Sequence, residues 1–258
     1  MVRLEDQIYG RLRLFNLAMG TLHLAQGAGM LFLSSDFTLP LRTTFLDSDP
    51  QREEIVTLTN TVFDLRLGPL VAVFLLISAA AHYLLASPVI HPWYVKNLKR
   101  HINYVRWYEY ALSSSVMIVV IAMLSGMFDL PSLVLLFALN ATMIFFGLMM
   151  ELHNQTTDKT NWTSFNLGVF AGIIPWVVIF WYFSGAVVNS EDAVPKFVYG
   201  IIASLFVFFN VFAVNMVLQY RRIGPWRDYL FGERMYILLS LFAKSALAWQ
   251  VFSGTLRG

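Results

Sequence analysis

Two charged side chains lie inside otherwise apolar stretches of the sequence. Lys244 is the only charged residue between Met235 and Gly254, a stretch that reads MYILLSLFAKSALAWQVFSG. A stretch of this length crosses the roughly 30 Å hydrocarbon core of a bilayer as a helix. A lysine near the middle of a membrane helix is costly and usually marks a function. Glu109 lies near the start of a second apolar stretch, RWYEYALSSSVMIVVIAML.

These two side chains are expected to meet. Side chains of a helix lean toward its N-terminus, so Lys244 reaches toward the membrane side on which Glu109 lies. Ser240 is one helical turn before Lys244, on the same face. Ser113 and Ser114 continue a polar strip from Glu109 along its own helix. An acid and a base inside a membrane form the expected neutralising pair.

The Lys244–Glu109 pair has two interpretations. It can be a structural clamp between helices, although a clamp rarely needs its lysine at mid-bilayer, where the cost is largest. Alternatively, Lys244 can react, because a lysine shielded from water is suited to forming a Schiff base with a carbonyl compound. The residues alone leave both interpretations open.

The composition is that of an integral membrane protein. Of the 258 residues, 57% are hydrophobic and only 13% are charged, whereas about 25% charged residues is typical of soluble domains. We expect a single membrane domain over residues 1–258, with its N-terminus retained as a helix start and not cleaved as a signal peptide. The absence of cysteine excludes disulfides and thiolate metal sites. No metal site and no binding of nucleic acid are expected.

Seven apolar segments predict an all-α bundle of seven membrane helices. Their approximate ranges are 14–33, 67–85, 105–127, 133–152, 165–185, 197–219 and 235–254. Only one connection, residues 34–66, is long, and a loop of that length in a compact bundle is usually functional or an interaction surface. Its stretch FTLPLRTTFL alternates apolar and polar residues, which is compatible with a short β-hairpin.

The basic residues predict the orientation in the membrane. Twelve lie on the face of the N-terminus and five on the opposite face, so the positive-inside rule puts the N-terminus in the cytoplasm and the C-terminus outside the cell. Loop 34–66 is then extracellular. A basic cluster in the last cytoplasmic loop is expected to anchor at anionic lipid headgroups, with binding of a protein partner as the alternative. Its members are Arg221, Arg222, Arg227 and Arg234.

The chain resembles retinal-binding rhodopsins, which have seven spans and a lysine in the middle of the last. The segment RWYEYALSSS resembles the microbial rhodopsin pattern around the carboxylate counterion, which is Glu109 here. Three features depart from ion-pumping members. Ser240 replaces their second counterion, Val120 replaces the proton donor of proton pumps, and the sixth span lacks their aromatic-proline signature. Together with the long first loop and the cytoplasmic N-terminus, these features are similar to heliorhodopsins, and the stretches SLFAKSALAWQ and YEYALSSS carry the resemblance most specifically.

The resemblance implies a retinal chromophore, all-trans in the dark, on Lys244, with Glu109 as the lone counterion. Light would isomerise the retinal and deprotonate its Schiff base without vectorial ion pumping. The implied protein is a light sensor and not an enzyme. The implied partners are the lipid bilayer, a second copy of the chain in a dimer and an unidentified cytoplasmic signalling partner. Light-gated or light-driven proton transport is the alternative, and a membrane enzyme or regulatory subunit that uses Lys244 without retinal is a third hypothesis.

The remaining candidates surround this centre. His23 and His82 either form neutral hydrogen bonds between helices or, as the resemblance implies, belong to a polar cavity that holds a released proton. Gln26 and Asn140 are possible members of that cavity. Four residues lie at the membrane depth expected for an apolar retinal-binding slot. Ordinary core packing is the competing interpretation for each of them. These residues are Met117, Met143, Phe206 and Phe209.

Overall fold

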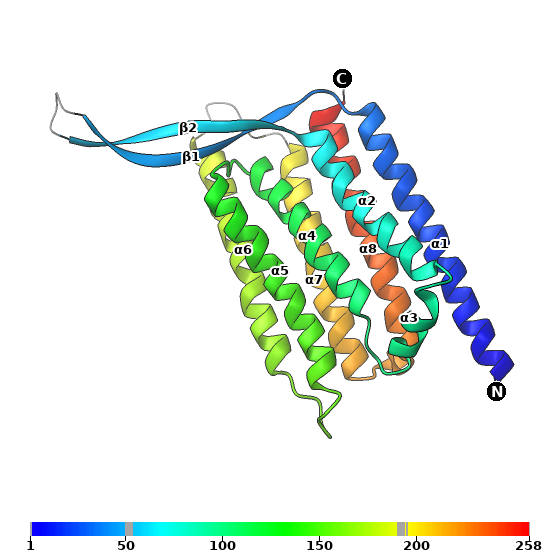
Figure 1. Cartoon of the computed structure of the whole chain (residues 1–258). Coiled ribbons are helices and arrows are strands. Elements are labelled where there is room, and N and C mark those ends of the chain that lie inside the picture. Colours follow the sequence, from blue (N-terminus) through cyan, green and yellow to red (C-terminus); the bar gives the residue numbers. More distant parts are fainter. Residues whose placement is uncertain (1, 50–53, 190–193, 195, 258) are drawn as a thin grey trace.

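The structure is a computed structural model, and it describes residues 2–49, 54–189, 194 and 196–257. Long helices run roughly parallel or antiparallel in one bundle, and a β-hairpin crosses one end of it (Figure 1). The long helices are α1 (Val2–Leu33), α2 (Leu67–Ala86), α4 (Tyr104–Leu124), α5 (Leu130–His153), α6 (Thr163–Asn189), α7 (Lys196–Tyr220) and α8 (Tyr229–Val251). Two short turns, Gly224–Arg227 before α8 and Phe252–Leu256 after it, complete the bundle.

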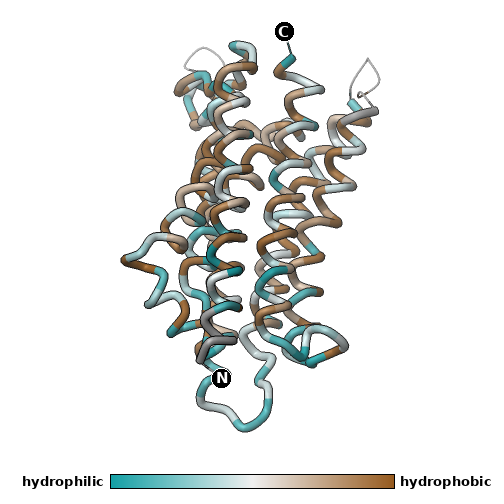
Figure 2. The backbone as a smooth tube through the Cα atoms, turned by 90° about the vertical axis from the view of Figure 1, so that its right-hand side faces the viewer, coloured by the Kyte–Doolittle hydropathy of each residue, from teal (hydrophilic) through white to brown (hydrophobic). Residues whose placement is uncertain are grey.

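Six of the described helices are long and apolar enough to cross a membrane, namely α2 and α4 to α8. The seventh expected span lies within α1, whose polar residues, among them Asn16, His23 and Gln26, lower its hydropathy. Although α1 does not qualify by composition, it packs alongside α2 (Figure 1). Hydrophobic residues predominate along the helices, whereas the loops near the N-terminal end of the bundle are largely hydrophilic (Figure 2). These features confirm the predicted all-α membrane bundle.

The first loop forms a longer hairpin than expected. Strands β1 (Thr38–Asp49) and β2 (Glu54–Arg66) pair antiparallel, with a register shift between Leu41 and Arg42. The hairpin is held to the bundle where the Arg42 amide donates to the Phe128 carbonyl, at 2.9 Å. It extends sideways past α5 and α6 (Figure 1). The alternation of apolar and polar residues in FTLPLRTTFL predicts a short hairpin. The observed strands extend well beyond that stretch.

A short helix that the sequence did not suggest connects α2 to α4. This helix, α3 (His91–Leu98), has a proline in its first turn and buries Tyr94, Asn97 and Leu98. Eight residues are too few for a membrane span, and its mixed composition gave no clear helical pattern. Asn103 then caps α4 by accepting a hydrogen bond from the Arg106 amide at 3.1 Å. This cap fixes the register of the helix that carries Glu109.

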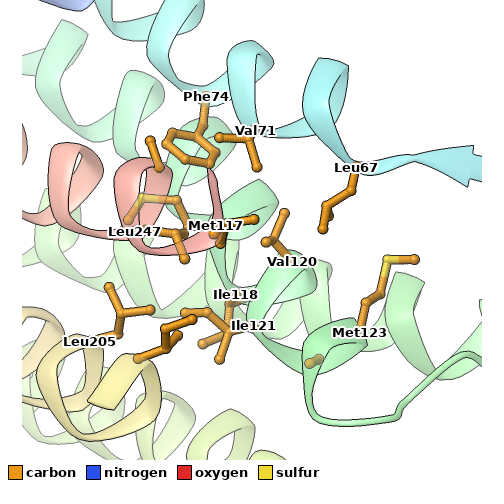
Figure 3. Packing of buried hydrophobic residues seen from close by; sticks show 14 of the residues in the cluster. Leu67, Val71, Phe74, Met117, Ile118, Val120, Ile121, Met123, Leu205 and Leu247 are labelled. Atoms are coloured by element: carbon orange, nitrogen blue, oxygen red, sulfur yellow. The ribbon is translucent and has the colours of Figure 1, made fainter. Parts of the chain in front are cut away.

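The main core lies between α2, α4, α7 and α8. Phe74 and Val71 of α2 face Met117 of α4, with Leu247 of α8 beside them, whereas Ile118 of α4 lies on the side nearer α7 (Figure 3). All five side chains are buried. In lipid, such helix contacts are held by close packing and not by exclusion of water. The named core residues lie about one turn beyond Lys244 and more than two turns beyond Glu109 along their helices, so this packing fixes the distance between the two helices.

Candidate functional site

The centre of the bundle brings Lys244 and Glu109 into contact. Lys244 Nζ donates to Glu109 Oε1 at 2.7 Å and to Ser240 Oγ at 2.8 Å. Both charged side chains are buried, with 3% of Lys244 and 8% of Glu109 exposed. The Tyr110 ring lies 5.2 Å from Lys244 Nζ, within cation–π range. Lys244 is therefore in contact with both Glu109 and Ser240, the two residues that the helix directions predict as its neighbours.

Ser78 of α2 is a second partner of Glu109 that the sequence analysis missed. Its hydroxyl donates to Glu109 Oε1 at 2.6 Å, the closer of two acceptors for its single proton; the other is the Phe74 carbonyl of its own helix, at 3.1 Å. The available signal was a lone hydroxyl in the apolar stretch FLLISAAA. Two donors on one oxygen stabilise the ionised carboxylate, because hydrogen bonds to a charged acceptor are stronger than neutral ones.

A largely apolar cavity of about 390 Å³ lies on the other side of Lys244. All the sequence candidates for a retinal slot line it, together with the lysine and three serines. These lining residues are Ser113, Ser114, Met117, Met143, Phe206, Phe209, Ser240 and Lys244. Ile173 and Val177 of α6 and Phe206 of α7 are also exposed, so the cavity reaches the bundle surface between these helices. Its volume is within the usual range for small-molecule sites.

Aromatic residues missing from the sequence prediction form much of this wall. Trp107, Tyr110, Trp176 and Tyr236 line the cavity, and the Tyr110 hydroxyl donates to the Tyr236 carbonyl at 2.8 Å. Aromatic residues are so frequent in this chain that none of these stood out. A Cβ on Gly147 would lie only 2.3 Å from the Trp107 ring, so only glycine lets this indole pack against α5.

Glycines of α6 also shape the cavity. A Cβ on Gly172 would lie 2.4 Å from Met143 Sδ, and one on Gly168 would lie 3.2 Å from Phe146 Cβ. Spaced by four residues, the two glycines let α5 and α6 approach closely, as small residues do at membrane helix interfaces. Met143 is thereby directed into the cavity wall.

The serines of α4 divide between two environments. Ser114 donates to the Tyr110 carbonyl at 2.7 Å and accepts from Asn140 at 2.9 Å. Ser113 Oγ is buried, lines the cavity and has no geometric hydrogen-bond partner in the described part of the chain. A buried hydroxyl of this kind is expected to bond a ligand or an ordered water.

The two membrane histidines lie together beside Glu109. The His23 and His82 rings stack with their centroids 5.6 Å apart, and His82 Nδ1 lies 2.8 Å from Asn16 Oδ1. A small cavity of about 30 Å³ joins His82 and Asn16 to Glu109, enough for one or two waters. Both ring nitrogens of His23 lack a partner among the described residues. His82 thus faces Glu109 across a small polar cavity, and His23 stacks on His82.

Two further candidates lie away from the histidines. Gln26 is half-buried and accepts a hydrogen bond from Trp249 Nε1 at 2.9 Å. Asn140 donates to Ser114 and Ser115, which places it between α5 and α4. The structure therefore does not bring Gln26 or Asn140 into the small polar cavity beside His82.

A buried charge cluster at the N-terminal end of α4 escaped the sequence analysis. Arg106 forms ion pairs with Glu151 of α5 and Glu233 of α8, and all three side chains are buried. Asn103 donates to Glu233 at 2.8 Å, and Trp107 donates to Glu151 at 2.7 Å. Glu151 and Glu233 lie near the ends of apolar segments, so the sequence pattern does not indicate that they are buried. The cluster ties three helices together.

Two aromatic rings outside the membrane spans border this cluster. The buried Tyr94 hydroxyl has a pKa raised above its ordinary value by burial and by Glu233. His101 stacks on Tyr229 at 4.5 Å, and its pKa is lowered by partial burial and by Arg222, with Glu233 opposing. Both groups are therefore neutral at pH 7. Within the described residues, no cluster of three histidine, aspartate or glutamate side chains could hold a metal ion.

The bundle and its centre define a class of membrane protein. A lysine buried in the last helix, paired with a single carboxylate and facing an apolar cavity, is the arrangement of a rhodopsin-type protein. The heliorhodopsin family model matches residues 12–256, and the chain belongs to the heliorhodopsin family. The comparison with curated proteins found no match.

Proposed function

We propose that this protein is a light-sensing receptor that carries all-trans retinal on Lys244 in the dark and does not pump ions. Family membership implies retinal and a multi-pass membrane location. The observation that carries the proposal is the position of Lys244, whose amine lies between Glu109 on one side and the apolar cavity on the other. We therefore propose a role as a photoreceptor and not as an enzyme.

The residues of the cavity fit a retinal chromophore. The cavity is largely apolar, and Lys244 and Ser113 contribute an amine and a hydroxyl to its wall. Bound retinal supplies visible absorption and a light-driven change of shape. Met117, Met143, Phe206 and Phe209 pack along it, and Trp107 and Tyr236 limit its movement.

Glu109 and the serines control the charge at Lys244 Nζ. Glu109 Oε1 balances a positive nitrogen at this position, and Ser240 and Ser78 hold the pair in line through their hydrogen bonds. A buried charge is tolerated only when it is paired in this way. A displacement of the nitrogen from Glu109 therefore favours release of its proton. His82 and His23 are the nearest bases across the small polar cavity, and they are proposed to receive it.

Several features favour a sensor over a pump. Ser240 stands one turn before Lys244, where a pump would have a second carboxylate, and Val120 is a buried apolar side chain with no proton to give. In the alternative, light-driven or light-gated proton transport, Glu109 and the two histidines would form the proton pathway.

Illumination of cells that carry the pigment is expected to change the external pH no more than in dark controls, with or without a protonophore. A light-induced pH change that the protonophore abolishes would establish transport.

Replacement of Glu109 by glutamine tests the counterion. The variant is expected to absorb at a different wavelength and to lose its visible band at lower pH, because a neutral amide no longer balances the positive nitrogen. Spectrophotometric titration of the purified pigment measures both effects. Asn140→Leu is the matched control, since Asn140 lies outside the charge centre. An unchanged titration in Glu109→Gln would remove Glu109 from this role.

The orientation and the oligomeric state are part of the same proposal. The basic residues near the N-terminal end of the bundle favour a cytoplasmic N-terminus and an extracellular C-terminus. The hairpin then lies outside the cell and exposes Phe45, Leu46 and Ile55, and its far end extends beyond the edge of the bundle (Figure 1). Exposed apolar patches of this kind mark interaction sites, which supports a homodimer. An unidentified cytoplasmic partner would receive the signal.

A further inference from the structure

The buried charge cluster at the N-terminal end of α4 contains more acid than base. Arg106 pairs with Glu151 through one terminal nitrogen and with Glu233 through the other. The exposed fraction of the side chain is 4% for Arg106, 2% for Glu151 and 0% for Glu233. In the described part of the chain, Arg106 is the only cation that forms an ion pair with either carboxylate. If both carboxylates were ionised, the cluster would carry one uncompensated negative charge.

An uncompensated charge is strongly unfavourable at a site so well shielded from water. The amide groups of Asn103 and the indole of Trp107 donate hydrogen bonds to the two carboxylates, but these neutral donors do not cancel a charge. Two carboxylates held close together in a protein commonly share one proton for this reason. A single proton here leaves one arginine, one carboxylate and one carboxylic acid, and the cluster is then neutral.

A protonated carboxyl group needs an acceptor for its own hydrogen bond. The Tyr229 hydroxyl is buried and has no geometric hydrogen-bond partner among the described residues. It lies near enough to interact electrostatically with both Glu151 and Glu233. Because a phenol oxygen accepts as well as donates, Tyr229 supplies an acceptor beside the pair.

The other ionisable groups around the pair do not change this balance of charge. Four are phenols, which are neutral at pH 7, namely Tyr94 of α3, Tyr220 of α7, and Tyr229 and Tyr236 of α8. His101 is also neutral, because partial burial and Arg222 lower its pKa. Arg222 itself is exposed, so water and salt screen its charge.

A water-sized cavity connects this cluster to the Lys244–Glu109 pair. The cavity of about 30 Å³ that reaches Glu109 and His82 is also lined by Asn103 and Arg106. Arg106 Nε is buried and has no hydrogen-bond partner in the described residues. A buried N–H of this kind is expected to donate to an ordered water. A water in this cavity can supply the missing acceptor between Arg106 and Glu109.

We propose that Glu151 and Glu233 bind one proton between them at neutral pH, which makes the cluster a second proton site beside the Lys244–Glu109 pair. The proton belongs to the two carboxyl groups together. When either group is replaced by an amide, Arg106 faces a single carboxylate and no charge remains to be neutralised. Binding of this proton does not require retinal.

The response of this proton to light rests on the proposed function. A change of charge at Glu109 is expected to alter the hydrogen bonding of the shared proton through the water cavity. The experiment therefore measures the proton in the dark first and its response to light second.

Infrared spectroscopy of the full-length protein at pH 7 in the dark, in H2O and after exchange into D2O, tests the shared proton. The C=O stretching band of a protonated carboxyl group is separate from carboxylate bands and shifts on deuteration. We expect such a band with the intensity of one carboxyl group, lost completely in Glu151→Gln and equally in Glu233→Gln. Asp228→Asn changes an exposed carboxylate at the start of α8 and is expected to retain the band.

Isotope labelling gives the same information without a substitution. In the parent protein, the band is expected to shift when the side-chain carboxyl of glutamate carries carbon-13, and not when that of aspartate does. Absence of the band from the parent, a shift with labelled aspartate, or a band that survives in either single variant would overturn the shared proton.

Illumination of the pigment is expected to shift the same band in light-minus-dark difference spectra. A band that is present but insensitive to light would overturn the connection through the water cavity and leave the shared proton standing. Failure to form any pigment contradicts the proposed function and does not affect the result in the dark.

Discussion

Lys244→Ala is expected to abolish the visible absorption band completely when retinal is added. Alanine has no amine to form the covalent link, and Lys96, Lys99 and Lys159 do not line the central cavity. Absorption spectroscopy of the purified variant after incubation with all-trans retinal measures the effect. Ser240→Ala is the matched control one turn away, and it is expected to retain the band because the amine is still present.

Loss of the band must be separated from loss of the fold. Lys244→Ala leaves Glu109 buried without its cation, which is itself destabilising. The double variant Lys244→Ala/Glu109→Gln removes the stranded charge and is expected to recover most of the lost thermal stability, yet still to form no pigment. A visible band of normal intensity in either alanine variant would exclude covalent attachment at Lys244.

Arg106→Met is expected to destabilise the protein by about 3–5 kcal/mol, the usual cost of removing one partner of a buried ion pair. Arg106 is the only cation of its cluster, so both Glu151 and Glu233 lose their partner together. Methionine preserves much of the side-chain volume and isolates the effect of charge. The measurement is the free energy of unfolding in mixed micelles, titrated with a denaturing detergent.

The control for this experiment removes the stranded charges. The triple variant Arg106→Met/Glu151→Gln/Glu233→Gln contains no buried charge in the cluster, so its loss of stability is expected to be clearly smaller. If the single and triple variants lose the same stability, packing of the arginine side chain and not its charge holds these helices together.

The membrane bundle could be predicted because its signal is local. Long apolar segments mark the helices, and the end of the bundle at which each charge lies follows from counting spans. The contact between Lys244 and Glu109 was also predictable, since both lie in apolar stretches at a matching depth. The hairpin was foreseen from its alternating residues, whereas α3 was not, because eight residues of mixed character give no clear period.

The remainder of the site depends on which helices become neighbours. Ser78 contacts Glu109 only because α2 packs against α4, and nothing in the α2 sequence identifies that partner. Glu151 and Glu233 lie at helix ends, where carboxylates are ordinarily solvated, so their burial around Arg106 had no local sign. Gln26 shares a helix with His23 but bonds Trp249 of α8 instead. Helical spacing predicts which face of its helix a residue occupies, but it does not predict which residue of another helix that face contacts.

The most direct test of retinal attachment at Lys244 is to trap the link chemically and locate it. The purified protein is incubated with all-trans retinal, reduced with sodium borohydride under illumination, digested and mapped by mass spectrometry. The expected result is one retinyl-modified residue, Lys244, with Lys96, Lys99, Lys159 and Lys196 unmodified. A retinyl group on another lysine, or no retinyl peptide from a protein that shows a visible band, would contradict this account.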